Sequence, residues 1–389
     1  MTEWKEYKLG EIGTVITGKT PSARNPEDWG DNMLFITPSD YRNYRKYATN
    51  SERKLSKVGI DRFEKKILPA NSILVTCIGS DMGKVVMNRE LCITNQQINA
   101  IVPNTSVNND FLYYRLISIY DTLRILGGDG TAVPIVNKSD FENIRIELPP
   151  LPEQIRIASI LSSLDDKIDL LHRENKTLEA MAETLFRQWF IEEAKEDWEE
   201  GKLGDILSVK GGTTPSTKEP SFWDGDIAWT SPRDVTTLNG LYLFETEKRI
   251  TQRGLEQISS GLLPSGTLLM SSRAPVGVLA FAEIPLAINQ GYIAILDDKG
   301  YSKEFIYLWL KTNMDLVHSY SNGSTFMEIS KSAFKSLDIS IPSKNEVECF
   351  VQEVKPYFDK IRTNEIQIRT LTKTRDGLLP KLMSNEINI

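Results

Sequence analysis

One stretch near the start of the chain has the residue types and the spacing of a phosphate-binding loop. Residues 13–20 read Gly-Thr-Val-Ile-Thr-Gly-Lys-Thr and match the pattern GxxxxGK[ST] at every position. In such loops, backbone N–H groups hold phosphate at the start of a helix that follows a strand. Here Pro21 and Pro26 come directly afterwards, and they prevent a regular helix from beginning there. We therefore interpret the match as chance and expect no nucleotide site at this loop.

Residues for hydrolytic or metal chemistry are scarce. Asp40 with Glu64 and Lys66 resembles a dispersed nuclease set, but Glu64 and Lys66 have no clear partners in the second half of the chain. The histidines are His172 and His318, and the cysteines, none in a CxxC pair, are Cys77, Cys92 and Cys349. Scattered cysteines of this kind fit buried thiols of a reduced, cytoplasmic protein. We predict no catalytic residue and no metal site.

The composition indicates a soluble protein of two or three domains. Its 389 residues are 40% hydrophobic and 25% charged, which is ordinary for globular domains. Its apolar stretches fall short of the roughly 18 residues that a membrane helix needs, and its N-terminus has no apolar segment of signal-peptide type. The net charge of −7 argues against indiscriminate nucleic-acid binding, so we expect the isolated chain to bind DNA weakly.

Basic charge is nevertheless concentrated in residues 42–66. Tyr41, Tyr44 and Tyr47 are interleaved with this stretch, which contains only three acidic residues. Its nine basic residues are Arg42, Arg45, Lys46, Arg53, Lys54, Lys57, Arg62, Lys65 and Lys66. The counterpart in the second half of the chain, residues 233–253, is close to neutral. Both a DNA-facing patch and a solvated surface fit this stretch, and the charges alone decide nothing.

The organisation that must position these residues is an internal repeat. Residues 4–40 return without a gap as residues 198–234, and 15 of the 37 positions are identical. Further identities follow in the same order, among them Asn95-Gln96 with Asn289-Gln290. In the second copy, the phosphate-loop pattern has lost its first glycine and its lysine. A period near 194 residues describes two copies of a whole domain, which offer similar surfaces to two similar targets.

Each copy begins with about 150 residues of mixed α and β character, at residues 1–150 and 196–343. Apolar runs bounded by turns predict the strands, which are residues 72–77, 85–87, 98–102 and 144–148, with residues 266–271, 278–281, 292–296 and 337–341 in the second copy. Helices are expected at residues 109–124, capped by Asn108 or Asn109, and at residues 302–313. The predicted fold class is α+β, with two similar mixed α/β domains.

Each domain is followed by a long helix, at residues 151–195 and 344–389. Apolar residues recur at spacings of four and three over more than four heptads, which is typical of a coiled coil. The positions expected at the interface are Leu161, Leu164, Ile168, Leu171, Asn175, Leu178, Leu185, Val354, Tyr357, Ile361, Asn364, Ile368, Leu371 and Leu378. Packing of each stripe against its own domain is the alternative, and the presence of two copies favours pairing. The helices must then run antiparallel, because the second domain connects their opposite ends.

Polar residues and prolines in these helices are expected to affect their pairing and their length. Asn175 and Asn364 lie inside the stripes, where a buried polar residue helps to fix the register. Pro356 is expected to weaken the start of the second helix, and Pro380 to end its regular pattern early. A helix over residues 157–189 is about 50 Å long. Two domains held by it in a pseudo-twofold, inverted arrangement suit DNA half-sites one turn apart, roughly 34–36 Å.

Short motifs recur in order along both copies. They begin with Lys8-Leu-Gly10 and Gly18-Lys-Thr-Pro-Ser22, which return as Lys202-Leu-Gly204 and Gly212-Thr-Thr-Pro-Ser216. The second copy adds Ser272-Arg-Ala-Pro-Val-Gly277, and the helices end in Leu185-Phe-Arg-Gln-Trp-Phe190 and Leu378-Leu-Pro-Lys-Leu-Met383. Each motif is modestly specific, but together they cover nearly all of the chain. In these motifs the chain resembles the DNA-specificity subunit of Type I restriction–modification systems.

The resemblance implies two target-recognition domains, each reading one half of a split double-stranded DNA site, and two spacer helices that pair as a coiled coil. It also implies that the helices and nearby surfaces dock two methylation subunits, which carry S-adenosylmethionine and the adenine chemistry. A restriction and translocase subunit that uses ATP and Mg joins for cleavage. The chain itself is then a non-catalytic, DNA-binding subunit that holds no cofactor.

Base reading in a DNA groove uses Arg, Asn, Gln and small hydroxyls, while Lys and Arg bind phosphates. Candidates in the first copy are Lys19, Thr20, Arg24, Ser39, Tyr41, Arg42, Tyr44, Arg45, Ser80, Lys84, Asn95 and Gln96. In the second copy they are Thr214, Lys218, Ser231, Arg233, Ser272, Arg273, Asn289, Gln290, Ser324 and Thr325. For shared positions such as Thr20 and Asn95, a structural role is the alternative, because domains that read different half-sites should differ at their base contacts. Trp29 and Trp223 are interpreted as core anchors.

Two other classes of function stay open beside a sequence-specific DNA-binding scaffold. An NTPase or nuclease built on residues 13–20 or on the scattered carboxylates would act as the purified chain, and Lys19→Ala would abolish its activity. A pure interaction scaffold would bind protein and would enrich no split motif from random duplexes.

Overall fold

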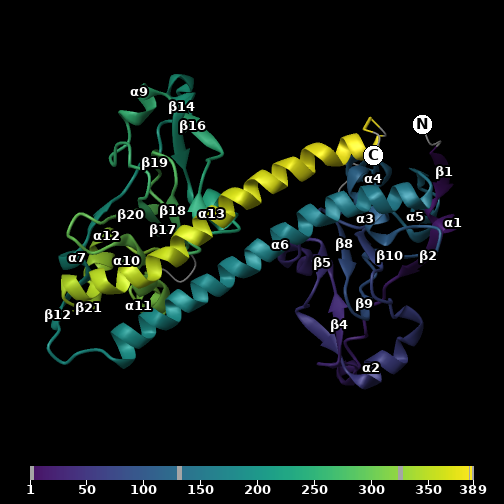
Figure 1. The fold of residues 1–389 in the computed structure, drawn as a ribbon, viewed down its shortest axis with the longest axis horizontal. Coiled ribbons are helices and arrows are strands. Elements are labelled where there is room, and N and C mark those ends of the chain that lie inside the picture. The colour runs from purple at the N-terminus through teal and green to yellow at the C-terminus, as the bar shows by residue number, and fades with distance from the viewer. Residues whose placement is uncertain (1–3, 129–133, 323–326, 385, 388–389) are drawn as a thin grey trace. The chain divides into compact units, whose positions relative to one another are not determined.

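A computed structural model describes residues 4–128, 134–322, 327–384 and 386–387 (Figure 1). The chain divides into two compact units, residues 1–170 with 369–389 and residues 171–368. Each unit contains one α+β domain together with part of helix α6 (Leu151–Arg187) and part of helix α13 (Lys344–Met383). Both long helices therefore contribute to both units. Among the described helices, none combines the length and the apolar character needed to span a membrane.

The first domain is built on a five-stranded sheet with the order β2-β10-β7-β8-β5. Its strands are β2 (Gly13–Thr17), β5 (Tyr47–Ala48), β7 (Ile73–Thr76), β8 (Val85–Asn88) and β10 (Ile98–Pro103). A second sheet, β3-β6-β4-β9, consists of β3 (Trp29–Gly30), β4 (Met33–Ile36), β6 (Arg53–Leu55) and β9 (Cys92–Thr94). A separate pair joins β1 (Lys5–Lys8) to β11 (Arg145–Leu148), the two ends of the domain.

The second domain repeats this plan, which confirms the internal duplication. Its main sheet, β13-β20-β17-β18-β15, consists of β13 (Ser208–Lys210), β15 (Tyr242–Leu243), β17 (Leu268–Ser271), β18 (Leu279–Ala282) and β20 (Tyr292–Leu296). Its second sheet, β16-β14-β19, consists of β14 (Trp223–Thr230), β16 (Lys248–Ile250) and β19 (Leu286–Ile288). The terminal pair is β12 (Glu199–Lys202) with β21 (Asp338–Ile341). In this domain, the long β14 takes the places of both β3 and β4.

Short helices connect these strands. In the first domain they are α1 (Leu9–Ile12), η1 (Pro26–Asp28), η2 (Pro38–Asn43), α2 (Lys57–Arg62), η3 (Glu64–Lys66), α3 (Asn109–Ser118), α4 (Tyr120–Leu126) and α5 (Lys138–Glu142). In the second they are α7 (Leu203–Ile206), η5 (Pro220–Phe222), α8 (Pro232–Thr236), α9 (Gln252–Leu255), α10 (Lys303–Thr312), α11 (Met314–Ser319) and α12 (Lys331–Lys335). A π-helical turn, η4 (Gln188–Glu192), follows α6.

The expected single helix over residues 109–124 is corrected to two. Asn108 caps α3 as predicted, since its side chain accepts the N–H of Phe111, but the chain leaves the helix at Ile119 before α4 begins. The second domain breaks in the same way at Asn313, between α10 and α11. Because isoleucine and asparagine share no helix-breaking tendency, packing within the domain sets this break rather than the local sequence.

Each domain core takes side chains from both long helices. In the first unit, Ile157 and Leu161 of α6 and Leu382 and Met383 of α13 are buried in one core with Phe111. In the second unit, the corresponding core is built around aromatic residues, and the ring centroid of Phe186 on α6 lies 5.9 Å from that of Phe350 on α13 and 5.6 Å from that of Phe305 on α10. The apolar stripes thus pair with each other and also pack on the domains.

The two helices run antiparallel, as the sequence predicted. In the second unit, Phe350 packs against Trp189, and further along α13 the amide of Asn364 donates to Oδ1 of Asn175 over 2.8 Å. Partner numbers on α6 therefore fall as numbers on α13 rise. All fourteen expected interface positions are buried or half-buried, and Asn364 is fully buried opposite Asn175.

The expectation for the prolines of the second helix is wrong. Helix α13 is continuous from Lys344 to Met383 and includes both Pro356 and Pro380, which lie on its exposed side. A proline inside a helix costs about 3 kcal/mol through its lost hydrogen bond and ring clash. Burial of Leu382 and Met383 in the core of the first unit offsets that cost at Pro380, so the helix continues past it.

We expect Phe186→Ala to destabilise the second unit by about 3–5 kcal/mol, because it opens a cavity where α6 meets both α13 and α10. Native-state hydrogen exchange should show faster exchange in α10 and unchanged exchange in α3. Met181→Ala, at a side chain that is 44% exposed on the same helix, is the matched control and should stay within about 0.5 kcal/mol of the parent. Equal loss of protection in α3 and α10 would contradict the division into two units.

Candidate nucleic-acid interface

The same side-chain pair links two loops in both domains. The hydroxyl of Thr20 donates to Oε1 of Gln96 over 2.6 Å, and the hydroxyl of Thr214 donates to Oε1 of Gln290 over the same distance. Both glutamines are exposed. Glutamine is one of the residues whose amide pairs with adenine in the major groove. These paired loops are therefore the repeated element that could present an amide to DNA.

A glycine brings the two loops close together in each domain. A Cβ atom at Gly18 would lie 2.2 Å from the carbonyl oxygens of Thr94 and Asn95, and a Cβ at Gly212 would lie 1.7 Å from that of Ile288. Any other residue would push the loops apart, since heavy atoms do not approach so closely. The repeated glycine thus positions the loop pair.

The phosphate-loop pattern does not fold as a phosphate-binding loop. Gly13–Thr17 forms strand β2, and residues 18–56, all of them described, contain short strands, turns and 3-10 helices but no α-helix. Without a helix N-terminus, the backbone N–H groups of this segment do not converge on a phosphate position. The interpretation of the match as chance agrees with this geometry.

The shared aspartate of each domain holds a turn. In the first domain, Asp40 accepts the N–H of Thr37 through Oδ2 and that of Glu52 through Oδ1, over 2.8 and 2.9 Å. Asp234 does the same in the second domain with Ser231 and Glu247. A carboxylate occupied by backbone N–H groups serves the fold, so the resemblance of Asp40 to a nuclease residue has a structural explanation.

Asn95 and Asn289 also serve their own loops. Oδ1 of Asn95 accepts the N–H of Gln97 over 3.1 Å, and Oδ1 of Asn289 accepts the N–H of Gly291 over 2.8 Å. This is the structural alternative that the sequence left open for these shared positions. It leaves the adjacent glutamines, rather than the asparagines, facing solvent.

The remaining candidates divide by exposure. The exposed ones are Lys19, Arg24, Ser39, Arg42, Arg45, Ser80, Lys84, Gln96, Thr214, Lys218, Arg233, Arg273 and Gln290. The half-buried ones are Thr20, Tyr44, Ser231 and Asn289, and the buried ones are Tyr41, Asn95 and Ser272. Ser324 and Thr325 lie outside the described residues. Contact of any of these residues with DNA stays a prediction.

Trp29 and Trp223 are half-buried and pack edge-to-face against Phe35 and Trp229, with ring centroids 5.1 Å apart in each pair. Both tryptophans belong to the small core of the second sheet in their domain. Their packing agrees with the interpretation as core anchors.

Two residues of the basic stretch fasten the first domain to α6. Nη2 of Arg45 lies 2.7 Å from Oδ1 of Asp169 on that helix. The amine of Lys46, which is only 5% exposed, lies 2.7 Å from Oδ1 of Asp110 and donates to the hydroxyl of Ser162 over 2.8 Å. The sequence placed Arg45 among the DNA candidates, and in the structure its guanidinium forms this ion pair with α6.

One carboxylate joins three helices of the first unit. Asp165 on α6 accepts the hydroxyl of Tyr114 on α3 over 2.6 Å, and its other oxygen accepts Nη1 of Arg375 on α13 over 2.7 Å. Burial and the nearby carboxylate raise the pKa of Tyr114 far above its usual range, so its hydroxyl stays a donor. Because Arg375 occupies a position of the apolar stripe, this ion pair supplies the partner that a cation in such a seam needs.

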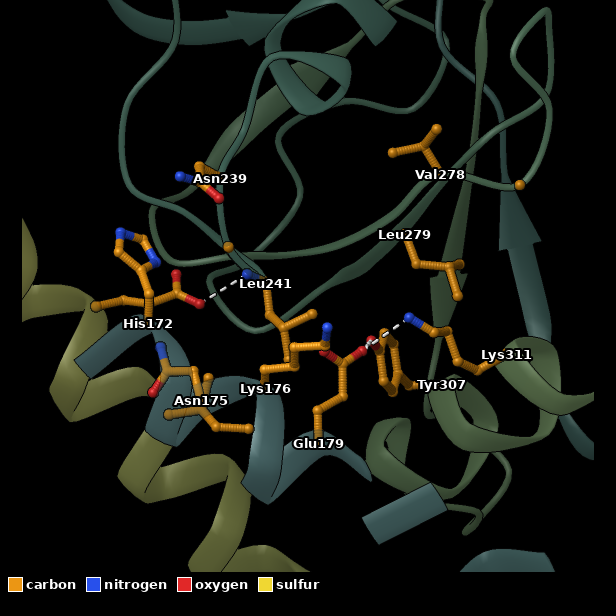
Figure 2. Close-up of a pocket in the computed structure, with 14 residues that line it drawn as sticks. His172, Asn175, Lys176, Glu179, Asn239, Leu241, Val278, Leu279, Tyr307 and Lys311 are labelled. Atoms are coloured by element: carbon orange, nitrogen blue, oxygen red, sulfur yellow. Dashed lines mark hydrogen bonds and ion pairs between the residues drawn. The ribbon is translucent and has the colours of Figure 1, made fainter. Parts of the chain in front are cut away.

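The second unit uses different residues for the same purpose, around a cavity of about 400 Å³ (Figure 2). Glu179 on α6 accepts the hydroxyl of Tyr307 and lies 2.8 Å from the amine of Lys311, both on α10. From α13, the carboxylate of Glu365 accepts the backbone N–H groups of Leu241 and Tyr242 over 2.7 and 3.1 Å. Figure 2 shows Glu179 and Lys311 meeting below the loop that carries Asn239 and Leu241.

Burial is the main influence on Glu365. It raises the pKa of this carboxyl to about 7, and the neighbouring carboxylates of Glu179 and Glu283 add to the increase, while the two backbone N–H groups oppose it. The side chain is 5% exposed. The contact between α13 and the second domain therefore contains a carboxyl that titrates near neutral pH.

Sequence reasoning missed these fastening residues. Asp165, Glu179 and Glu365 look like ordinary surface acids of an amphipathic helix, because their burial depends on the domain that packs over them. One signal was available: Arg375 stands where the stripe should be apolar, and a half-buried cation there requires an acid on the facing helix.

We expect Glu365→Gln to change how stability depends on pH. The folded chain binds a proton at Glu365 more tightly than the unfolded chain, so the stability from this group is fully present below about pH 4.5 and is lost as the pH rises to 7. Glutamine removes that loss, which is on the order of 3 kcal/mol. Thermal unfolding of the full chain between pH 5 and 7.5 should show that the variant becomes more stable relative to the parent as the pH rises. If stability depended on pH in the same way in Glu365→Gln and in the exposed control Glu348→Gln, the raised pKa of Glu365 would be contradicted.

Comparison with known proteins assigns the chain to a family. A family model described as the Type I restriction modification DNA specificity domain matches residues 1–180 and again residues 195–373. The chain is 28% identical over 417 residues to the specificity subunit of the Type I restriction enzyme MjaIX of Methanocaldococcus jannaschii, with 100% of this chain and 94% of that protein covered. It is 24% identical over 474 residues to the HindI specificity subunit of Haemophilus influenzae, with 100% of both covered.

A solved structure shows the same fold. The S subunit of a Type I restriction-modification system from M. genitalium superimposes with a TM-score of 0.60 at 17% identity, covering 98% of this chain and 96% of that one. The two family matches fall on the two copies of the internal repeat, and each includes one α+β domain with part of a long helix. The chain therefore belongs to the Type I restriction–modification DNA specificity family, as a specificity subunit.

Proposed function

We propose that each of the two domains reads one half of a split double-stranded DNA site. The observation that carries this proposal is the repeated loop pair, in which Thr20–Gln96 and Thr214–Gln290 present an exposed amide from the same place on the same scaffold. Other exposed candidates differ between the domains, with Lys19, Arg42 and Lys84 in the first domain and Arg233 and Arg273 in the second. The shared amide suits a base that both half-sites have in common, and the differing side chains suit the bases at which two half-sites differ.

The helices then set the spacer between the half-sites. A continuous helix of 37 residues, the length of α6, extends about 55 Å, which exceeds one turn of DNA. Support for a fixed helix pair comes from the contact of Asn364 with Asn175 and the ion pair of Arg375 with Asp165. A polar pair in an otherwise apolar seam is costly to shift by a turn, so it favours one register.

In this proposal the chain has no catalytic role of its own. Two methylation subunits dock on the helices and nearby surfaces and bring S-adenosylmethionine, and a restriction subunit brings ATP and Mg for translocation and cleavage. The shared Asp40 and Asp234 and the glycines of the loop pair are all explained by the fold, which leaves recognition to the exposed amides and cations.

Mapping of methylated adenines tests the proposal directly. The chain is expressed with its methylation subunits in a host that lacks adenine methylation, and the modified bases of the host genome are sequenced. We expect one split motif with a spacer of fixed length, because both domains must contact DNA together. Adenine methylation without any split motif would favour a scaffold that does not read DNA. Cleavage or ATP hydrolysis by the purified chain alone would favour the enzyme alternative.

We further expect Gln96→Ala and Gln290→Ala to relax different halves of that motif. A bidentate contact to a base contributes about 1–3 kcal/mol of discrimination, so each variant should accept wrong bases in one half-site and keep the other half. The same methylation map gives the measurement. Lys5→Ala, at an exposed residue of the terminal strand β1, is the control and should leave both halves unchanged. If either glutamine variant lost base specificity in both half-sites, this would count against independent reading by the two domains.

A further inference from the structure

The second sheets of the two domains share a plan but differ in charge. We call residues 18–67 the first lobe and residues 212–262 the second lobe. The first lobe contains β3, β4, β6 and α2, and the second contains β14, β16 and α9. The first lobe has eleven basic and seven acidic residues, whereas the second has five basic and seven acidic residues. Because the scaffold is common to both, the excess of cations in the first lobe is not a requirement of the fold.

Some cations of the first lobe are used within the first unit. They are Arg45 with Asp169, Lys46 with Asp110, Arg62 with Glu27 and Asp28, and Lys66 with the carbonyl oxygen of Thr17. In addition, the guanidinium of Arg53 lies 3.3 Å from the ring centroid of Trp29. These contacts hold the lobe together and fasten it to α6.

Other cations of the first lobe are not neutralised in this way. Lys54, Lys57 and Lys65 form no ion pair with any residue in the described ranges. Lys57 begins α2 and Lys65 lies in η3, and both are exposed, while Lys54 on β6 is half-buried. Figure 1 shows α2 and β4 at the end of the first domain that is remote from α6. Positive charge is thus presented at the outer end of this domain.

In the second lobe, carboxylates outnumber cations, and among the described residues Arg233 is the one cation of this lobe that forms an ion pair. Nε of Arg233 is 3.8 Å from Oε2 of Glu247. The pKa of Glu219 is lowered, first by its hydrogen bonds with Ser221 and then by the nearby charge of Arg253. With seven acidic and five basic residues, this lobe offers DNA phosphates little net attraction.

We infer that the two domains divide DNA binding unequally, and that the first lobe supplies most of the phosphate contacts made by this chain. This inference rests on the proposed function and deepens it, because it assigns the sugar–phosphate backbone of one half-site to Lys54, Lys57 and Lys65. The second domain then depends on its base contacts and on its partner subunits. An uneven division also fits a chain whose overall charge is −7, since binding by phosphate contact needs local rather than total positive charge.

The salt dependence of binding measures this division. Each phosphate contact contributes about 0.9 to the slope of log K against log salt concentration on B-form DNA. The test uses the complex of the full chain with its methylation subunits, and a duplex that carries the split motif found by methylation mapping. The first variant combines three substitutions, Lys54→Gln, Lys57→Gln and Lys65→Gln. Its slope should be shallower than that of the parent by about 2.7 if all three lysines contact phosphates.

A second triple variant is the matched control. Lys248→Gln, Arg249→Gln and Arg253→Gln remove the same number of charges from the second lobe, so any effect of net charge alone is equal in the two variants. We expect this variant to change the slope by less than about 0.9, the equivalent of one contact. A third variant with Lys54, Lys57 and Lys65 replaced by arginine keeps the charges and should retain the parental slope, which separates loss of charge from damage to the fold.

The outcomes separate failure of this inference from failure of the proposed function. A parental complex that binds the split motif, with equal changes of slope in the two glutamine variants, would overturn the unequal division and leave DNA reading intact. An unchanged slope in the first-lobe variant would overturn it as well. A parental complex with no preference for any split motif would instead overturn the proposed function. Preserved methylation of the same motif by the first-lobe variant supports the inference, because phosphate contacts carry no sequence information.

Discussion

Each domain of this protein completes its hydrophobic core with side chains from two helices that are far apart in the sequence. In the first unit, α6 and α13 contribute Leu161 and Leu382 to a single buried cluster, and in the second they contribute Phe186 and Phe350. Each of these clusters would lose buried side chains if either helix were absent. The antiparallel pairing of α6 with α13 is therefore a requirement of both cores, and a polar contact such as that of Asn364 with Asn175 selects among the registers that the apolar seam would accept.

Buried charge makes the attachment of domain to helix specific. The first unit uses Asp165 to hold Tyr114 and Arg375, whereas the second uses Glu179 and Glu365 around a cavity. Such groups contribute little net stability, because the cost of removing charge from water consumes most of the gain from pairing. They provide geometric specificity instead, because a carboxylate can reach its fixed hydrogen-bond donors in only one placement of the helix on the domain. The two units thus satisfy the same geometric demand with unrelated chemistry, as expected for repeats that have diverged.

Much of this architecture was accessible from the sequence. The period of 194 residues predicted two copies of one domain, and apolar runs bounded by turns located strands such as β7, β10 and β20. Asn108 marked the start of α3. The apolar stripes predicted the antiparallel helices. Pro380 was expected to end the helix, but the helix continues because Leu382 and Met383 are buried in the core of the first domain, which lies more than 200 residues earlier in the chain. The binding candidates were harder to sort, since Tyr41 and Asn95 have the right chemistry but lie inside the domain. Residue type indicates what a side chain could contact, and only the fold determines which side it faces.

The shared cores impose an order on how the chain can be completed during synthesis. The second unit has all of its parts once residue 368 has been made, whereas the first unit needs Leu382 and Met383 from the last turns of α13. Of the two domains, the one synthesised first is therefore the last to be completed, and its apolar face stays open while more than 200 further residues are translated. A premature stop between codons 369 and 382 would leave every residue of the second unit in place and would remove Leu382 and Met383 from the core of the first.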